Sequence, residues 1–310
     1  VVQSKDVALE AELARKYAIA FYVKGDYYLS LTHFLEAEKL FRELDDWESV
    51  GKCLNGLGLI QQGIDRHIEA VDYFKQAIDY YNLAEDDYAA APAVINLGVS
   101  ELQTGELEKA KVTLDSALSL AVASGRKDIE HLTLNHLGNL AYEKSEIPTA
   151  LKYYQSVLND SVEPNNWEKA FSYYGLARTN LALNNLDAAE VFGLKALDFA
   201  KNNGSFFELE RITGVLFDIY DEQGNLEKAV VFSKQNKAYR DSLYNQKRIR
   251  AINLLNLEQK EADNRRLRTE KMEKDKELSK NKLIIAILLF AGFVLLLILF
   301  FWIKNYKQKE

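Results

Sequence analysis

The chain has 310 residues, of which 27% are charged, and it carries a net charge of −7. Three prolines, 15 glycines and the lack of strand-type alternation favour an all-α protein, and the single Cys53 excludes an intramolecular disulfide. Residues 1–240 hold 24 Lys and Arg against 37 Asp and Glu, so this acidic part of the chain is a poor candidate for binding nucleic-acid phosphates.

A small residue recurs at an almost constant interval along residues 1–240. The steps between its successive occurrences are 40, 40, 40, 39 and 40 residues. Each occurrence closes a turn phrase such as "TGELEKA" (104–110) or "QGNLEKA" (223–229), with an apolar stretch of helical spacing on either side. The pattern predicts six helical hairpins, one around each of the anchor residues Ser30, Ala70, Ala110, Ala150, Ala189 and Ala229.

The same phrases specify how each hairpin turns and packs. Gly25, Gly105 and Gly224 can adopt a positive φ at little cost, and Pro148 falls in the first turn of a second helix, where its missing N–H is tolerated. The small anchor lets two helices approach closely, and a larger residue four positions later fills the space beside it. This larger residue is Phe34, Phe74, Leu114 or Tyr154 in the first four repeats, whereas Gly193 and Ser233 break the rule in repeats five and six.

These features together resemble the tetratricopeptide repeat. The small residue is followed four positions later by an aromatic residue or leucine, and a Leu-Gly pair lies one helix earlier in "GLGLI", "NLGVS" and "HLGNL". The usual repeat has about 34 residues, so these are longer, as in the long-repeat variants of bacterial regulators and motor light chains. The resemblance covers residues 8–240. It implies a right-handed superhelical solenoid of about six hairpins over residues 1–240, which binds a protein or peptide in a concave groove lined by the first helices.

Carried over position by position, the resemblance places seven polar residues in this groove: Arg15, Asn55, Asn96, Asn135, Asn139, Arg178 and Arg211. Asparagine both donates and accepts hydrogen bonds, which suits a peptide backbone, and arginine can hold a carboxylate with two bonds. Asn135 and Asn139 share a helix face, and Asn96 lies at nearly the same place one repeat earlier, so one extended peptide should reach all three.

We expect Asn135 and Asn139 to be exposed, and their joint replacement by alanine to leave folding nearly intact. The alternative is that these polar residues cap neighbouring helices or simply face water. Tyr22 and Tyr142 are expected to add flat apolar contact to the groove.

No motif typical of catalysis or of cofactor binding occurs. None of the four histidines is followed by Glu or Asp, as the phosphoacceptor of a sensor kinase would be. His131 and His136 are five residues apart, the wrong spacing for two metal ligands on one helix face, and we expect both to be solvated or to line the groove. Gly58 and Gly63 are followed by Ile64, where a P-loop needs lysine. The sequence therefore predicts a binding protein without metal or cofactor, and not an enzyme.

The chain changes in character after residue 240. Residues 241–282 contain neither Gly nor Pro and carry opposite charges three and four positions apart, which predicts an exposed linker helix through which two copies could pair weakly. Residues 283–303 contain no charge and would extend about 31 Å, the length of a transmembrane helix. Lys282 and Lys304 flank this segment, and residues 304–310 form a basic tail.

This order of elements, over residues 236–310, resembles the linker of bacterial membrane sensors. In these, a periplasmic tetratricopeptide domain is joined through one span to a cytoplasmic histidine kinase or LuxR-type DNA-binding domain. The resemblance implies that the chain is the sensory input part of a signal-transduction protein in the inner membrane, with the effector domain absent. Because the chain begins with Val1 and its single methionine is Met272, we expect the native start to be missing. Lys and Arg are more frequent before the span than after it, which favours the alternative of a tail-anchored scaffold with its repeats in the cytoplasm.

Overall fold

The computed structural model describes residues 2–86, 88–203, 205–246 and 255. The chain divides into two compact units, Val1–Asn253 and Leu254–Glu310, and every helix described below belongs to the first. The predicted linker helix from residue 247 onwards, the apolar segment 283–303 and the tail 304–310 lie outside the described residues, apart from the single residue Leu255.

The described residues form helices and turns, with no strand among them, so the prediction of an all-α protein is confirmed. The helices are α1 (Val2–Lys24), α2 (Tyr27–Glu43), α3 (Trp47–Gln62), α4 (His67–Leu83), α5 (Ala91–Gln103), α6 (Leu107–Ser124), α7 (Lys127–Glu143), α8 (Ile147–Leu158), α9 (Asn166–Ala182), α10 (Leu186–Asn203) and α11 (Phe206–Glu222). Residues 226–246 form a further helix. These elements pair into six hairpins at the positions that the 40-residue period predicts.

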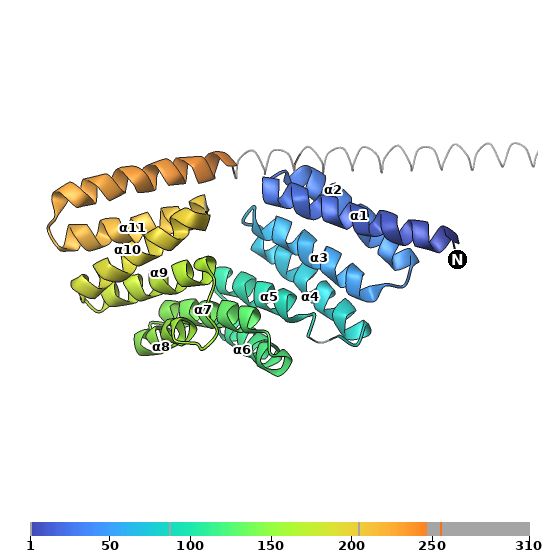
Figure 1. Ribbon diagram of the computed structural model, residues 1–310, viewed down its shortest axis with the longest axis horizontal. Coiled ribbons are helices and arrows are strands. Elements are labelled where there is room, and N and C mark those ends of the chain that lie inside the picture. The colour runs from blue at the N-terminus through green and yellow to red at the C-terminus, as the bar shows by residue number, and fades with distance from the viewer. Residues whose placement is uncertain (1, 87, 204, 247–254, 256–310) are drawn as a thin grey trace, which may run out of the picture. The chain divides into compact units, whose positions relative to one another are not determined.

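The hairpins follow one another in chain order along a curved path (Figure 1). Each first helix contacts the next first helix, from α1 through α3, α5, α7 and α9 to α11, whereas no such contact joins successive second helices among α2, α4, α6, α8 and α10. The first helices therefore lie closer together and occupy the inside of the curve. We call the side of the solenoid formed by α1, α3, α5, α7, α9 and α11 the inner face.

Small anchor residues lie where the two helices of each hairpin meet, as predicted. All six are buried, with exposed fractions between 0 and 3%. In the first four repeats, the larger residue that follows the anchor packs into a slot left by a glycine of a first helix. A Cβ atom added to Gly138 would lie 2.5 Å from the Tyr154 ring, and one added to Gly58 would lie 2.4 Å from the Phe74 ring. The Leu-Gly pairs thus supply the space that Phe74, Leu114 and Tyr154 fill, whereas Phe34 packs against Gly56 of α3.

Left-handed backbone conformations recur every 20 residues in the turns from Gly25 to Ser145, and again at Asn184 and Gly224. In the turn within each hairpin, the residue with positive φ is Gly25, Asp65, Gly105, Ser145, Asn184 or Gly224. The prediction for the three glycines is confirmed, and the other repeats place Asp, Ser or Asn at the same point. Asp45, Glu85 and Gly125 adopt this conformation between hairpins. The prediction for Pro148 is also confirmed, because it lies in the first turn of α8.

In the fifth repeat the glycine and the large residue exchange places between first and second helices. Gly193 on the second helix α10 leaves the space, and Leu216 of the following first helix α11 fills it, with the Leu216 Cδ2 2.7 Å from where a Cβ of Gly193 would lie. Gly193 breaks the sequence rule because the large residue comes from the other side of the interface. In the sixth repeat Ser233 is exposed, and Asn236 is buried in the same helix, as is the anchor Ala229.

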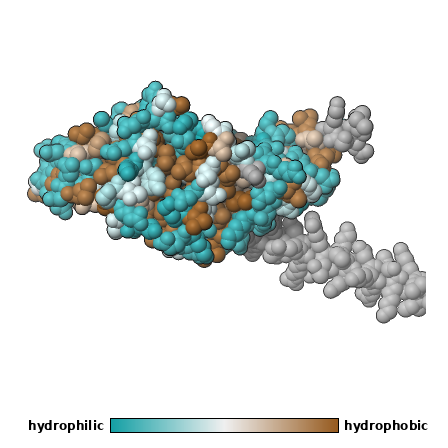
Figure 2. Space-filling model, turned by 90° about the horizontal axis from the view of Figure 1, so that it is seen from below, coloured by the Kyte–Doolittle hydropathy of each residue, from teal (hydrophilic) through white to brown (hydrophobic). Residues whose placement is uncertain are grey.

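Apolar side chains also occur outside the core. Figure 2 views the molecule from below Figure 1, where α6 and α8 lie, and shows hydrophobic residues interspersed with hydrophilic ones. Val112 on α6, for example, is 71% exposed. Single exposed apolar residues are normal on soluble surfaces and need no partner. Among the residues that the structure describes, no helix is both long enough and apolar enough to cross a membrane.

Candidate functional site

Two grooves are lined mainly by residues of the inner face. The first, which we call the N-terminal groove, has a volume of about 510 Å³ and is lined by Arg15, Ile19, Tyr22, Phe34, Glu48, Lys52, Asn55, Gly56, Leu59, Tyr81, Ala89, Pro92 and Arg126. Its apolar walls carry three cationic side chains and one carboxylate. A groove of this kind can hold apolar side chains of a ligand while the cations attract its negative charges.

The second groove, which we call the C-terminal groove, has a volume of about 570 Å³. It is lined by Leu102, Gln103, Gly105, Leu107, Asn139, Glu143, Phe207 and Arg211. These residues come from α5, the turn after it, the first turn of α6, α7 and α11, so the groove is built by elements far apart in sequence. The helix α5 contributes its first turn to the N-terminal groove and its last turn to the C-terminal groove.

All seven residues predicted for the groove lie on first helices, but the structure does not bring them together. Arg15 and Asn55 line the N-terminal groove, and Asn139 and Arg211 line the C-terminal groove. Asn96, Asn135 and Arg178 line neither groove. Their role in binding a peptide stays a prediction.

Side chains of the N-terminal groove are fixed by their neighbours. Arg15 donates two hydrogen bonds to Glu12, at 3.0 and 2.7 Å, and these bonds raise the pKa of Arg15 and lower the pKa of Glu12. The Asn96 Nδ2 donates to the Asn55 Oδ1 at 3.0 Å, which links α5 to α3. Tyr22 lines the groove and stacks on Tyr27 with ring centroids 5.3 Å apart. The Asn55 amide is therefore held by Asn96 beside a rigid aromatic wall.

The expectation that Asn135 and Asn139 are exposed is wrong. Asn135 is 0% exposed and Asn139 is 8% exposed. The Asn135 Nδ2 donates to the Glu168 backbone oxygen at 3.3 Å, and its Oδ1 accepts from the Ser172 hydroxyl at 2.7 Å. The Asn139 Oδ1 accepts from the Tyr154 hydroxyl at 2.8 Å. These amides hold α7 against α8 and α9, so they satisfy buried polar groups of the protein itself.

Cationic and aromatic side chains alternate along α7, α9 and α11. The Arg178 guanidinium lies 3.8 Å above the Tyr142 ring and donates to the Asn139 Oδ1 at 3.0 Å. The Arg211 guanidinium lies 4.6 Å from the Tyr174 ring centroid and 5.3 Å from that of Phe207. Tyr142 thus contacts Arg178, where the sequence predicted a contact with the ligand. The aromatic rings orient both guanidinium groups.

Phe207 lines a groove at a position that the repeat pattern did not predict. It is 50% exposed, lines the C-terminal groove and lies four residues before Arg211 on α11. The i,i+4 spacing of an aromatic residue and an arginine was the available signal, because it places both on one helix face.

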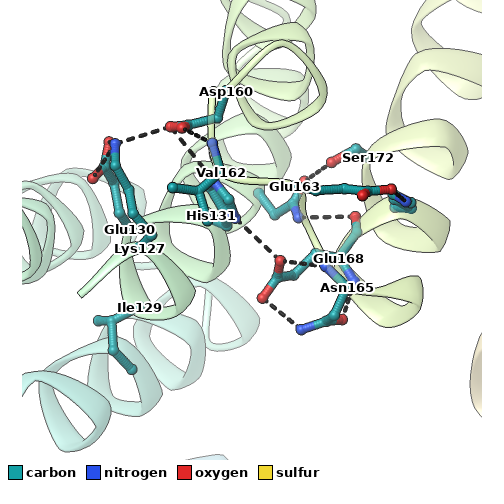
Figure 3. Close-up of polar contacts among 12 residues, drawn as sticks. Lys127, Ile129, Glu130, His131, Asp160, Val162, Glu163, Asn165, Glu168 and Ser172 are labelled. Carbon is teal, nitrogen blue, oxygen red and sulfur yellow. Dashed lines mark hydrogen bonds and ion pairs between the residues drawn. The ribbon is translucent and has the colours of Figure 1, made fainter.

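A buried polar network occupies the junction of α7 and α9, and Figure 3 shows His131 at its centre. The helix α8 is shorter than the other second helices, and residues 159–165 connect it to α9. The His131 Nδ1 lies 3.1 Å from a Glu168 carboxylate oxygen, and its Nε2 lies 3.5 Å from an Asp160 carboxylate oxygen. His131 is 1% exposed, so the expectation that it is solvated or lines the groove is wrong.

The carboxylates of this network are held by further partners. The Lys127 ammonium donates to the Asp160 carboxylate at 2.9 Å. The Val162 backbone N–H and Lys127 together hold the pKa of Asp160 well below its usual range. Glu168 forms a capping box with Asn165 at the start of α9. The network thus fixes the connection between the fourth and fifth hairpins.

The second histidine of α7 is also enclosed. His136 is half-buried, its Nδ1 is inaccessible to water, and its ring meets Phe171 edge-on at 5.3 Å between centroids. Burial, with a contribution from the positive charge of Arg211, lowers the pKa of His136 to about 4. The imidazole is therefore neutral at pH 7. His136 lines neither of the two grooves described above, and a place for it elsewhere along the inner face stays a prediction.

Two further observations concern chemistry at the inner face. Cys53 is completely buried, and burial raises the pKa of its thiol to about 12, so it is not a reactive thiol in the folded protein. Within the part of the chain that the structure describes, no group of three or more His, Cys, Asp and Glu side chains is arranged to hold a metal ion.

Comparison with known proteins identifies the tetratricopeptide repeat and a similar helical fold. Residues 9–82 match the model of the tetratricopeptide repeat family. No curated protein sequence matches the chain significantly. The apo form of RapI superposes with a TM-score of 0.62 at 19% identity, over 76% of this chain and 85% of RapI.

Two other solved Rap structures are similar. The Rap conjugation gene regulator of plasmid pLS20, in complex with the Phr* peptide, has a TM-score of 0.57 at 14% identity, over 78% of this chain and 77% of its own. A Rap protein complexed with competence and sporulation factor has a TM-score of 0.55 at 15% identity, over 77% of each chain. Identities this low show the fold alone. The chain therefore contains tetratricopeptide repeats in residues 9–82, and its helical hairpins have the fold of a tetratricopeptide-like solenoid.

Proposed function

We propose that the chain binds an extended peptide, or an extended segment of a protein, along the inner face of its solenoid. The observation that carries this proposal is the pair of grooves, about 510 and 570 Å³ in volume, that the first helices line. The Rap regulator of pLS20 has the same fold and was solved with the Phr* peptide, which supports a peptide as the kind of ligand.

The C-terminal groove offers the clearest chemistry for a peptide. Phe207, Leu102 and Leu107 provide apolar surface for a side chain of the ligand. Within the described part of the chain Arg211 makes no ion pair, and its guanidinium lies over two aromatic rings. An acidic side chain or a terminal carboxylate of the ligand would give Arg211 a charged partner in a partly desolvated site, where such a bond is stronger than in water.

Random peptides displayed on phage and selected on the full chain would test this proposal. Phe207→Ala should weaken binding of the selected peptides at least tenfold, because it removes exposed aromatic surface from the groove. Phe206→Ala is the matched control, since Phe206 is 40% exposed and adjacent in sequence but does not line the groove. Peptides that bind Phe207→Ala as tightly as the parent would place the recognition surface elsewhere.

The role of Arg211 has a separate test with the same peptides. Arg211→Ala should weaken binding of peptides that carry a carboxylate and should have little effect on their amidated or Asn/Gln counterparts. Equal losses for both kinds of peptide would show that Arg211 acts by packing and not by charge.

We further propose that residues 283–303 anchor this binding module to a membrane, as the input part of a signalling protein. This part of the proposal is supported by the sequence alone. Alkaline extraction of membranes that contain the full chain is the test. Recovery of the chain in the soluble fraction would contradict the anchor, and retention would support it. Protease protection of the repeats in sealed membranes would then distinguish the sensor from the tail-anchored scaffold.

A further inference from the structure

Among the described residues no preceding hairpin packs on the face of α1 that points away from α3, although the Tyr17 ring at its edge contacts His33 of α2 with ring centroids 5.7 Å apart. Counting back from the anchor residues gives equivalent positions on all six first helices. The equivalents of Leu13 are Cys53, Ala93, Thr133, Ser172 and Ile212, and their exposed fractions are 0 to 2%. The equivalents of Tyr17 are Leu57, Leu97, Leu137, Leu176 and Leu216, with exposed fractions between 0 and 8%. The preceding hairpin packs on these positions in repeats two to six.

In the first repeat the same two positions are open. Leu13 is 48% exposed and Tyr17 is 49% exposed, and Leu9, one turn earlier, is 70% exposed. The three residues follow one another at i,i+4 spacing and so form a stripe along one side of the helix. Solenoids usually end in a polar capping surface, because the last interface would otherwise be exposed to water. The stripe Leu9–Leu13–Tyr17 is instead an unsatisfied repeat interface.

Charges on either side of the stripe indicate which partner fits it. Asp6 and Glu10 are exposed at its beginning, and Lys16 and Lys24 are exposed at its end. Lys16 lies 3.8 Å from Glu12 and is 67% exposed, and no ion pair within the described residues involves Asp6, Glu10 or Lys24. Apart from Lys5, the helix thus has an acidic first half and a basic second half, and among the described residues only Lys16 of the four exposed charges named above already lies near a partner, Glu12.

We propose that two copies of the chain associate through antiparallel packing of α1 against α1 about a twofold axis. In this arrangement the apolar stripes face each other, and the acidic half of each α1 meets the basic half of the other. A parallel arrangement would place like charges together. A twofold interface requires a surface that is complementary to itself, and the segregated charges of α1 meet this requirement. Antiparallel helix dipoles also attract.

Sedimentation equilibrium of the full chain tests the association. The parent should form dimers, and Leu13→Glu combined with Tyr17→Glu should raise the dissociation constant at least a hundredfold, because four carboxylates would then face one another. Circular dichroism should be unchanged, since both side chains are about half exposed and the double change removes only one ring contact, that of Tyr17 with His33. Val112→Glu is the matched control, because it adds a carboxylate at an exposed valine of α6 and should leave the dimer intact.

Charge reversal tests the antiparallel orientation. Asp6→Lys with Glu10→Lys should weaken the dimer at least tenfold. Adding Lys16→Glu and Lys24→Glu to the same chain should restore it, because the acidic and basic halves are then exchanged. A parent chain that stays monomeric, or a dimer that survives Leu13→Glu with Tyr17→Glu, would overturn the proposal. If the quadruple variant dimerises no better than the double variant Asp6→Lys with Glu10→Lys, the antiparallel arrangement is refuted.

Discussion

Replacing Asn135 by alanine should destabilise the fold, although the spacing of Asn135 and Asn139 alone suggests a harmless exposed change. Asn135 is completely buried and bonds to the Ser172 hydroxyl and the Glu168 backbone oxygen. A net hydrogen bond contributes about 0.5–1.5 kcal/mol, and a buried group left without a partner costs about 1–3 kcal/mol. The freed Ser172 hydroxyl can turn to the Glu168 oxygen four residues earlier, which satisfies both groups in part. We therefore expect a loss of about 1–3 kcal/mol.

Urea unfolding followed by circular dichroism at 222 nm measures this loss. Asn96→Ala is the control, because Asn96 is only half-buried and makes a single side-chain bond to Asn55. Its cost should stay below about 1 kcal/mol. Ser172→Ala combined with Asn135→Ala should cost less than the sum of the two single changes, since the pair shares one bond.

Two results would contradict a structural role for Asn135. An Asn135→Ala protein whose free energy of unfolding lies within about 0.5 kcal/mol of the parent would show that the bonds to Ser172 and Glu168 contribute nothing. Additive effects of the two single changes would show that the side chains are not coupled. Either result would return Asn135 to the set of residues available for a ligand.

Three further predictions concern pH, turns and thiol reactivity. Burial lowers the pKa of His136 from 6.5 to about 4, so the unfolded state binds more protons than the folded state between these values, and stability falls as the pH drops from 6.5 towards 4. His136→Leu should reduce the loss of unfolding free energy between pH 6.5 and 4 by up to roughly 3 kcal/mol, measured in urea titrations at several pH values. An unchanged pH dependence of the unfolding free energy would show that another group causes the loss. Ser145→Gly should raise the free energy of unfolding by about 0.5–1 kcal/mol, because Ser145 has a φ of 60° and glycine adopts this conformation without strain; a loss in the same assay would contradict this. Cys53 should not react with an aromatic disulfide reagent at pH 8 until the protein unfolds, and labelling of the folded protein within seconds would mean that α3 opens readily.

The period of the sequence was sufficient to predict the hairpins, the anchors and the turns. A fixed step of about 40 residues repeats every local requirement of the backbone, so a glycine with positive φ in one turn indicates the conformation of Asp65 and Ser145 in the others. The single 39-residue step, from Ala150 to Ala189, was the signal for the exceptional repeat. It falls where α8 is short and residues 159–165 replace the regular turn.

Burial on the first helices could not be predicted from spacing. Helical periodicity places Asn135 and Asn139 on one side of α7, but the neighbouring hairpin decides whether that side meets water or α9. The same limit applies to His131, whose carboxylate partners are 29 and 37 residues away in sequence. Contacts between repeats depend on how each hairpin is rotated against the next, and the sequence of one repeat does not contain that information.

A left-handed residue lies at the same point of the turn in every hairpin, so whole hairpins could be removed or inserted without a change in turn geometry. Asp65 and Gly105 occupy the same point of successive hairpins, so a chain that lacks residues 66–105 would rejoin two turns of equal geometry. Such a deletion would remove one helix from the inner face and leave all others in phase. Gly58 would then receive Leu114 in place of Phe74, a smaller side chain for the same slot. The backbone of one hairpin can therefore replace that of another more easily than its core residues can. A change in the number of hairpins would require matched changes in the residues that fill the glycine slots.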